Sequence, residues 1–249
     1  IKRLDEIHSR NSLTSLTRSA WYCSGCPHNS STKAPDGSIV SAGIGCHTMA
    51  MWMGRGVVMG THMGAEGAQW IGMQPFTNTK HIFQNMGDGT YAHSGSLAVR
   101  YCAATNTNIT FKILVNSHTS MTGGQEIMGA EPVRAMVAEL IANGVKRVIV
   151  TTEDLSRYNA VNLSGNTEVW HRDRLIEAQK VLAEIEGTTV LIHDQECAAE
   201  LRRQHAEIAR LTTWRRWRVT AQCHRRSSNP QTTPHHTLPH ASVSKPISP

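Results

Sequence analysis

The sequence predicts an α/β fold, with a mostly parallel sheet covered by helices on both faces and a loop-rich N-terminal region. From residue 81 onward, short apolar runs typical of buried strands alternate with segments of helical periodicity. Such alternation implies crossover connections, which place parallel strands in one sheet and helices over both of its faces. Residues 21–76 are rich in glycine and small polar residues, a composition typical of loops that carry a site.

Each element follows from its local pattern. β-branched and apolar residues predict strands at 81–86, 108–115, 146–151 and 188–193, and a weaker strand at 167–171. Helical periodicity predicts helices at 94–104, 131–142 and 172–186. Pro132 suits the first turn of the second helix, and Asn143-Gly144 closes that helix.

Length and composition limit the class of protein. The chain has 249 residues and no run approaching the roughly 20 apolar residues of a membrane-spanning helix. Its charged start is not followed by an apolar stretch, so we expect no signal peptide, no membrane partner and a cytoplasmic location. Because no Met begins the chain, we expect a start inside a longer protein. We divide it into a connection (1–20) that opens with a short helix, a main domain (21–200) and a tail (201–249).

The tail has a different composition from the rest of the chain. It contains nine lysines and arginines and one glutamate, a net charge of +8, so residues 1–200 carry −2 of the total of +6. Prolines among Ser, Thr and His predict disorder there. The abrupt change favours a frameshift or a misassigned gene end. The alternative is a nucleic-acid-binding tail, because Trp214 and Trp217 lie among arginines, but we expect no nucleic-acid partner.

Polar residues follow two of the predicted strands. Gly87-Asp88-Gly89 ends the first strand, and Asn116 follows the next. Carboxylate and amide oxygens suit Mg²⁺, the flanking glycines allow close approach of a phosphate, and the carbonyl of His118 supplies a third oxygen. Ligands of parallel sheets bind at the carboxyl ends of the strands. The pattern predicts a magnesium diphosphate site, although a Gly-Asp-Gly turn alone is the simpler alternative.

Four cysteines have the spacing of a metal or cluster site: Cys23-x-x-Cys26, then Cys46 and Cys197. Thiolates are ligands for iron–sulfur clusters or zinc. The alternatives are structural zinc or burial as small hydrophobic residues, but the polar surroundings of Cys23 and Cys26 argue against burial. With no secretory signal, a disulfide framework is not expected. Cys102 lies in a predicted helix and belongs to the core, and Cys223 has no assigned role.

Several phrases together resemble the indolepyruvate ferredoxin oxidoreductase family, within the 2-oxoacid:ferredoxin oxidoreductases. They are CSGCPHNSST (23–32), GIGCH (43–47), THMGAEGAQW (61–70), QNMGDGTYAHSG (84–95) and MTGGQ (121–125). The resemblance spans about 21–200 and does not include the tail. It implies the thiamine-diphosphate-binding fold, with Mg²⁺ at Asp88, Asn116 and His118, and Gly45, Cys46, His47, Gly87 and Gly89 along the cofactor.

The resemblance also implies a [4Fe–4S] cluster on Cys23, Cys26, Cys46 and Cys197, and oxidative decarboxylation of a 2-oxoacid to its acyl-CoA. Coenzyme A is then the co-substrate, ferredoxin the electron acceptor, and indolepyruvate or another aryl 2-oxoacid the substrate. A thiamine enzyme also needs a carboxylate from a pyrimidine-binding domain, which we do not find. Only Glu66 merits a test, and the catalytic residue is unassigned. We therefore expect a partner domain or subunit in a homo- or hetero-oligomer.

Other residues near these motifs have weaker assignments. His28 and His47 are candidates for contact with the cofactor or a substrate carboxylate, and His62 with Glu66 flank Gly64 in the same region. Ordinary hydrogen-bonded histidines are the simpler reading, and His93-Ser94 simply begin a helix. Two alternative functions stay open: a non-redox thiamine-diphosphate decarboxylase or carboligase fragment, and a catalytically incomplete fragment that binds cofactor.

Overall fold

A computed structural model of the protein describes residues 19–58 and 60–211. The chain divides into two compact units, Ile1–Arg203 and Gln204–Pro249. The expected helix within 1–20 and the tail beyond 211 lie outside the described residues. Residues 198–211 are helical, although the composition of the tail predicts disorder from residue 201 onward. No helix in the described ranges has the length and apolar character needed to cross a membrane.

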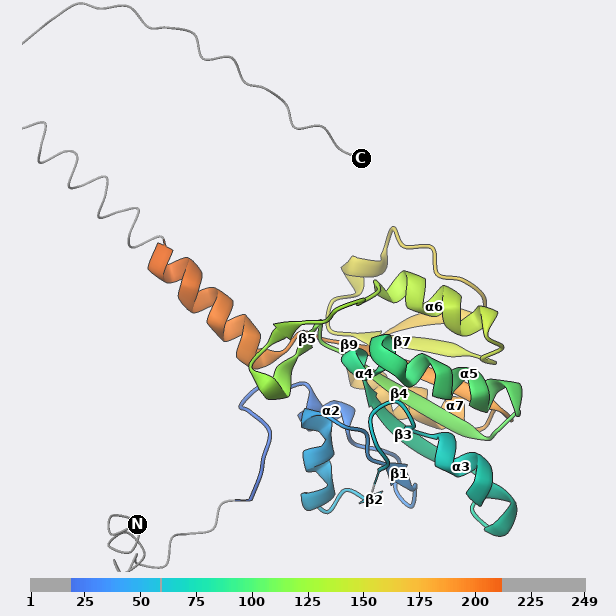
Figure 1. Ribbon diagram of the computed structural model, residues 1–249. Helices are drawn as coiled ribbons and strands as arrows, with labels where there is room; N and C mark the ends of the chain where they lie inside the picture. The colour runs from blue at the N-terminus through green and yellow to red at the C-terminus, as the bar shows by residue number, and fades with distance from the viewer. Residues whose placement is uncertain (1–18, 59, 212–249) are drawn as a thin grey trace, which may run out of the picture. The chain divides into compact units, whose positions relative to one another are not determined.

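The first unit is built on one seven-stranded parallel sheet (Figure 1). The strand order across it is β2-β1-β3-β4-β9-β7-β8. In chain order the strands are β1 (Val40–Ser41), β2 (Val57–Val58), β3 (Ile82–Gly87), β4 (Ile109–Val115), β7 (Val148–Thr152), β8 (Thr167–His171) and β9 (Thr188–Asp194). The register sets Gly87 of β3 beside Leu114 of β4, and Val115 of β4 beside Asp194 of β9. The carboxyl ends of these three strands therefore meet at one edge.

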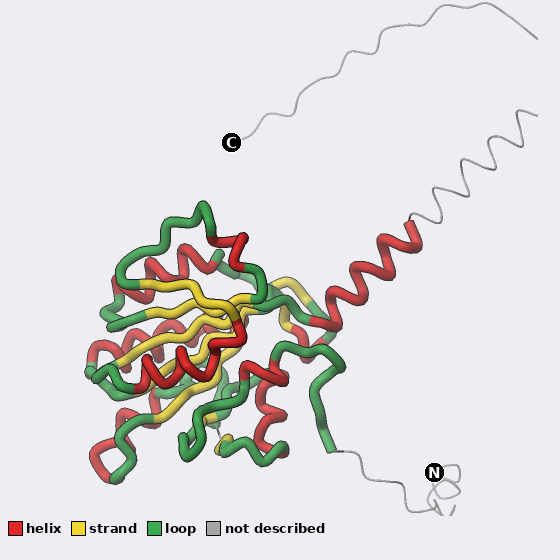
Figure 2. Tube along the Cα trace, turned by 180° about the vertical axis from the view of Figure 1, so that it is seen from behind, coloured by secondary structure: helices red, strands yellow, loops and turns green. Residues whose placement is uncertain are grey.

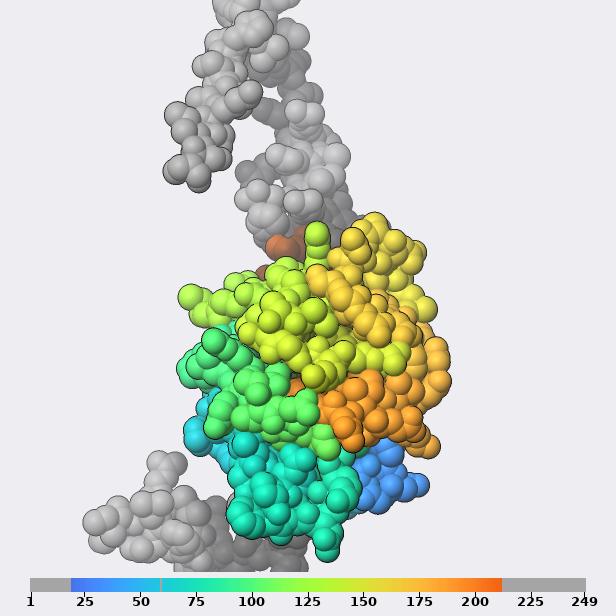
Figure 3. Space-filling view, turned by 90° about the vertical axis from the view of Figure 1, so that its right-hand side faces the viewer, coloured from blue at the N-terminus to red at the C-terminus, as the bar shows by residue number. Residues whose placement is uncertain are grey.

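Helices cover both faces of the sheet, as predicted. The helices α3 (Ala68–Met73), α5 (Ser96–Ala104) and α6 (Val133–Ala142) pack on one face, where alternate residues of β4 enter the larger core. The helix α7 (Leu175–Ala183) packs on the other face against Ile149 and Leu191. Figure 2 shows α7 across the near side of the strands, and Figure 3 shows the flank from teal (α3) through green (α5) to yellow-green (α6).

The long elements lie close to their predicted bounds, and the differences are local. The helix expected from Ser94 starts earlier, because the chain turns directly from β3 into α4 (Asp88–Thr90) and the π-helix η3 (Tyr91–Gly95). Pro132 is the N-cap of α6 rather than part of its first turn. The helix expected to reach residue 186 ends at Ala183. A turn follows it that needs the left-handed Gly187, at φ +100°.

The N-terminal region consists of loops and short elements, as expected. It contains α2 (His28–Ser31), the 3-10 helices η1 (Cys46–Trp52) and η2 (Gln74–Phe76), and the strands β1 and β2. The two short strands extend the sheet beyond β3, which the sequence analysis did not predict. A small antiparallel ladder of β5 (His118–Thr119) and β6 (Gln125–Glu126) follows β4. The remaining 3-10 helices are η4 (Ser120–Thr122), η5 (Leu155–Tyr158) and η6 (Arg172–Arg174).

Candidate cofactor and thiol site

Residues of the predicted site follow each of four neighbouring strands of the sheet: β1, β3, β4 and β9. The segment after β1 carries Gly45, Cys46 and His47, β3 runs directly into Asp88, and β4 into Asn116. Cys197 follows the end of β9 by three residues. Because these strands are parallel and adjacent, residues that are far apart in the sequence are delivered to the same edge of the sheet.

The Asp88 carboxylate is fixed by three backbone N–H groups. Oδ2 accepts from the amides of Asn116 (2.8 Å) and Ser117 (2.7 Å), and Oδ1 accepts from Gly89 (2.8 Å). The side chain is 8% exposed, and burial raises its pKa against the opposing effect of these hydrogen bonds. A carboxylate has about four lone-pair positions, so one remains for a cation.

The chain turns sharply after β4 so that two consecutive amides reach Asp88. Ser117 adopts a left-handed backbone at φ +63°, a conformation that costs energy in a residue with a side chain. Oδ1 of Asn116 accepts from the amide of His118 (3.0 Å), and Nδ1 of His118 lies 3.1 Å from the Asn116 carbonyl. The loop is thereby folded with the backbone amides of Asn116 and Ser117 directed at the carboxylate of Asp88.

A cavity of about 410 Å³ opens at this edge of the sheet, which is large enough for a small cofactor. All eight residues assigned to the cofactor or to Mg²⁺ line it: Gly45, Cys46, His47, Gly87, Asp88, Gly89, Asn116 and His118. His28 and His93 also line it. The rest of the lining is largely apolar and includes Ile44, Met63, Met121, Ile127 and Met128.

His47 is held in a cradle of three glycines. A methyl group at Gly43 would lie 2.7 Å from its Nε2, and methyl groups at Gly45 and Gly87 would lie 2.9 and 3.4 Å from its Cε1. The ring is 2% exposed, and its Nε2 has no hydrogen-bond partner in the described residues. Burial lowers the pKa of His47 to about 3 and that of His28 to about 4, so both are neutral at pH 7.

The four predicted ligand thiols interact electrostatically. Burial, together with the thiols of Cys46, Cys197 and Cys23, raises the pKa of Cys26 to about 11. Burial also raises the pKa of Cys46, as do Cys197 and Cys23. In the part of the chain that the structure describes, no three His, Cys, Asp or Glu side chains are grouped as for a single metal ion. The fifth described thiol, Cys102, is fully buried in the core, as expected.

Some candidates of the sequence analysis lie outside the cavity lining. Glu66 is fully buried, and its carboxylate accepts from the amides of Gly64 (2.6 Å) and Ile44 (3.4 Å), so it joins two loops. His62 is exposed. Ser94 packs under Gly64, where a Cβ would lie 2.1 Å from its Oγ. None of these three residues lines the cavity.

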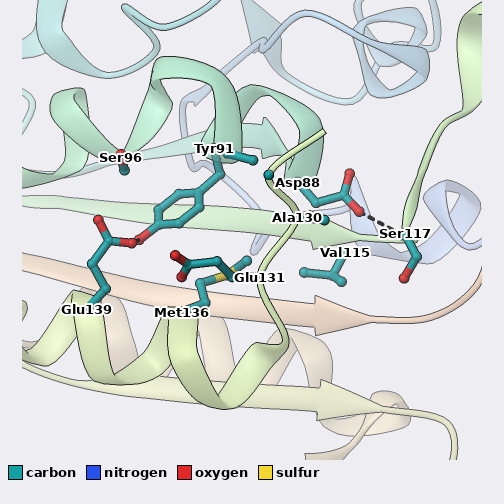
Figure 4. Close-up of a pocket in the computed structure, with 11 residues that line it drawn as sticks. Asp88, Tyr91, Ser96, Val115, Ser117, Ala130, Glu131, Met136 and Glu139 are labelled. Atoms are coloured by element: carbon teal, nitrogen blue, oxygen red, sulfur yellow. Dashed lines mark hydrogen bonds between the residues drawn. The ribbon is translucent and has the colours of Figure 1, made fainter. Parts of the chain in front are cut away.

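A smaller pocket of about 120 Å³ also has Asp88 in its lining (Figure 4). The Tyr91 hydroxyl points across it and donates to Oε2 of Glu139 (2.7 Å). Burial and this carboxylate raise the pKa of Tyr91. Glu131 and Ser117 also line the pocket, so its polar groups are mainly acceptors of hydrogen bonds.

Sequence reasoning missed three residues near the site. Lys112, in the middle of β4, is fully buried, and its Nζ donates to the carbonyl of Lys33 (2.8 Å). Burial, together with Arg55, lowers its pKa to about 7. A lysine inside the apolar run ITFKILV was the available signal. Tyr22 and Arg55 donate hydrogen bonds to backbone oxygens of the thiol-bearing loops. Because the acceptors are backbone atoms, no sequence pattern predicts these contacts.

Comparisons with known proteins agree with these motifs. No family model matches the chain. The indolepyruvate oxidoreductase subunit IorA of Pyrococcus horikoshii is 23% identical over 226 residues, covering 82% of this chain and 34% of the relative. The subunit of the same name from Thermococcus kodakarensis is 24% identical over 214 residues, covering 78% of this chain and 32% of the relative.

A solved structure gives a likeness in fold. The 2-oxoglutarate:ferredoxin oxidoreductase from Magnetococcus marinus, solved with 2-oxoglutarate, coenzyme A and succinyl-CoA, matches with a TM-score of 0.54 and 21% identity. The match covers 74% of this chain and 66% of that one. Together these findings support the 2-oxoacid:ferredoxin oxidoreductase family. The chain spans about a third of the length of its curated relatives in that family.

Proposed function

We propose that this chain is the thiamine-diphosphate-binding part of a 2-oxoacid:ferredoxin oxidoreductase and that its four thiols hold a [4Fe–4S] cluster. The observation that carries the proposal is the convergence of Gly45–His47, Asp88, Asn116 and Cys197 at the ends of four neighbouring strands. Thiamine diphosphate supplies an electron sink for cleavage of a carbon–carbon bond beside a carbonyl group. The residues of this chain hold it and exclude water.

The Asp88 loop suits Mg²⁺ bound to a diphosphate. Three backbone N–H groups hold the Asp88 carboxylate in one orientation, with a lone pair left for the ion. Asn116 Oδ1 and the carbonyl of His118 are the further oxygen ligands of the proposal. The cradled His47, together with Gly45 and Cys46, also lines the cavity. Because His47 is neutral, it binds the anionic diphosphate through hydrogen bonds rather than charge.

The proposal assigns the four thiols to one cluster. Each of Cys23, Cys46 and Cys197 makes ionisation of Cys26 harder, so a cationic centre among them would relieve this repulsion. The spacing Cys23-x-x-Cys26 and the family resemblance favour a [4Fe–4S] cluster over a single zinc ion.

The lining of the cavity favours an apolar 2-oxoacid, such as indolepyruvate. Ile44, Met63, Met121, Ile127 and Met128 line it, and methionine packs well against aromatic rings. No lysine or arginine is among the described lining residues, so a dicarboxylate such as 2-oxoglutarate would lack a cation for its second carboxylate. In the proposed reaction the 2-oxoacid would lose carbon dioxide and coenzyme A would take the acyl group. A cluster held by Cys23, Cys26, Cys46 and Cys197 would carry the two released electrons to ferredoxin.

The proposal includes a partner. The catalytic carboxylate of the reaction is assigned to a pyrimidine-binding domain or subunit, as the family resemblance implies. The second candidate function is a non-redox thiamine decarboxylase or carboligase. The position of Cys46 after β1 and of Cys197 after β9, on strands that flank the cofactor strands β3 and β4, favours the redox enzyme over this alternative.

Calorimetry on the full chain tests the cofactor part of the proposal. We expect thiamine diphosphate to bind in the presence of Mg²⁺ and not in the presence of a chelator, because the ion joins Asp88 to the diphosphate. Thiamine without phosphates is the matched control and should not bind under either condition. Equal binding of thiamine and thiamine diphosphate, or binding that ignores Mg²⁺, would contradict the assignment of Asp88 and Asn116.

A second titration tests the substrate class. With thiamine diphosphate and Mg²⁺ present, indolepyruvate should bind at least roughly tenfold more tightly than 2-oxoglutarate, a difference of about 1.4 kcal/mol. Phenylpyruvate, also apolar, should resemble indolepyruvate. Tighter binding of 2-oxoglutarate would reject the apolar class and leave the cofactor assignment intact.

A further inference from the structure

Tyr22 connects two of the segments that carry thiols. It immediately precedes Cys23, is 5% exposed, and its hydroxyl donates to the backbone oxygen of His47 (3.2 Å), the residue after Cys46. The same hydroxyl lies 3.3 Å from Oγ1 of Thr32. The rings continue this connection, since Tyr22 meets His28 edge to face at 5.8 Å and His28 meets His47 at 5.8 Å.

Arg55 binds the same assembly from the other side. Its Nη1 donates to Oγ1 of Thr32 (2.8 Å) and to the carbonyls of Asn29 (3.0 Å) and His28 (3.4 Å). Its guanidinium lies over the Tyr22 ring at 5.6 Å. A cation at the last carbonyls of a helix is favourable, and here the helix is α2, which begins two residues after Cys26. We call Tyr22, Thr32 and Arg55 the hub.

The hub is made entirely of protein groups. Thr32 is fully buried and donates to the carbonyl of His28 (2.6 Å), so its hydroxyl is both donor and acceptor within the hub. The segment that carries the fourth thiol, Cys197, has its own link, because Nη1 of Arg202 donates to the carbonyl of Ser24 (2.8 Å). That link is exposed and contributes less than the buried hub.

We propose that Tyr22 and Arg55 are positioning residues that fix the Cys23–Cys26 loop against the Cys46 segment before any cluster binds. The benefit that we propose for these contacts, easier binding of a cluster, rests on the proposed function. The contacts of Tyr22 and Arg55 themselves do not depend on it. A preorganised set of thiols loses less conformational entropy when it binds a ligand, so a hub of this kind favours cluster assembly and retention.

The test is thiol labelling of the full, metal-free chain with N-ethylmaleimide, read at each cysteine by mass spectrometry. Tyr22→Phe keeps the ring and removes the hydroxyl. We expect Cys26 and Cys46 to react about fivefold faster in this variant, the effect of losing one hydrogen bond. Cys102, fully buried in the core, reports global unfolding and should keep its rate. Arg55→Lys, which keeps the charge and loses the forked geometry, should act in the same direction.

Trp70→Phe is the matched control. It also removes a hydrogen bond from a buried aromatic side chain to a carbonyl, that of Asn108 (3.0 Å), but this side chain belongs to the larger core and not to the hub. It should leave the labelling of Cys26 unchanged. Unchanged Cys26 labelling in Tyr22→Phe overturns the hub, and so does a parallel rise at Cys102, which would mean general destabilisation.

Iron and sulfide reconstitution separates this inference from the proposed function. If the wild-type chain takes up a cluster, Tyr22→Phe should lose it faster and broaden its reduced electron paramagnetic resonance signal. If the wild-type chain takes up none, the cluster proposal is overturned, while the labelling of the metal-free chain still decides the hub.

Discussion

At the residue scale, Asp88 is the group on which the cofactor site depends. Its carboxylate accepts three backbone N–H groups from both strand ends, so it organises the loop and also faces the cavity. The two roles can be measured separately. The first contributes to the free energy of unfolding, and the second to the affinity for a cation that carries a diphosphate.

Asp88→Asn should impair both roles. An amide group offers a donor where Asn116 and Ser117 need an acceptor, so the free energy of unfolding should fall by about 1–3 kcal/mol. Mg²⁺-dependent binding of thiamine diphosphate, measured by calorimetry well below the unfolding temperature, should weaken at least roughly tenfold. Asp154→Asn, at an exposed site near the end of β7, is the control. Wild-type affinity in Asp88→Asn would contradict the metal assignment.

Lys112 makes stability depend on pH. Its pKa is about 7 in the folded chain and 10.5 when unfolded, so the unfolded state binds more protons between these values. Stability therefore rises with pH across this window, by up to about 1.4 kcal/mol per pH unit from this group. Lys112→Met should be more stable than wild type at pH 8, and its advantage should shrink by pH 9.5, as measured by urea unfolding.

The matched control for this prediction is Lys180→Met, on the exposed surface of α7. It should not change the pH slope. If the free energy of unfolding changes equally with pH in Lys112→Met and in wild type between pH 8 and 9.5, the prediction is wrong and Lys112 is not desolvated in the folded chain.

At the scale of elements, the backbone that follows β1 packs so closely against β3 that no side chain fits at Gly43. A Cβ at Gly43 would lie 2.2 Å from the backbone oxygen of Asn85, which cannot move without shifting β3. Gly43 also borders the His47 ring. The glycine is therefore required by the close approach of the backbones rather than by its own φ.

Gly43→Ala should destabilise the protein by about 2 kcal/mol or more and weaken binding of thiamine diphosphate, because the Cys46 segment must shift. Gly72→Ala, inside α3 and with open space around the new methyl group, should instead stabilise by roughly 0.5–1 kcal/mol. Thermal unfolding of both variants checks the contrast. A tolerated Gly43→Ala would contradict the described packing of β1 against β3.

The elements also show why part of the fold was predictable. The apolar runs of β3, β4, β7 and β9 are long enough to reveal buried strands, and β8 lies at its predicted bounds. The two-residue strands β1 and β2 are too short for any periodicity, and only pairing with β3 defines them. The insertion of β9 between β4 and β7 is likewise a property of the whole sheet that no local pattern encodes.

At the scale of the whole molecule, parallel topology explains why the candidate site could be foreseen. Asp88, Asn116 and Cys197 follow strands, and adjacent parallel strands end at one edge whatever the length of the crossovers. The hub and Lys112 were not foreseen, because their partners are backbone oxygens contributed by distant loops. The chain also corresponds to about a third of its relatives, so we expect further parts of the enzyme to complete the reaction.

If the four thiols and the cofactor loop form one redox site, anaerobic reconstitution of the chain with iron and sulfide should assemble a cluster there. We expect about four iron and four sulfide per chain and a paramagnetic signal after dithionite reduction. Cys26→Ser should lose that signal, while Cys102→Ser, in the core, should retain it. One zinc per chain, or no metal after reconstitution, would contradict the redox assignment and favour a non-redox thiamine enzyme.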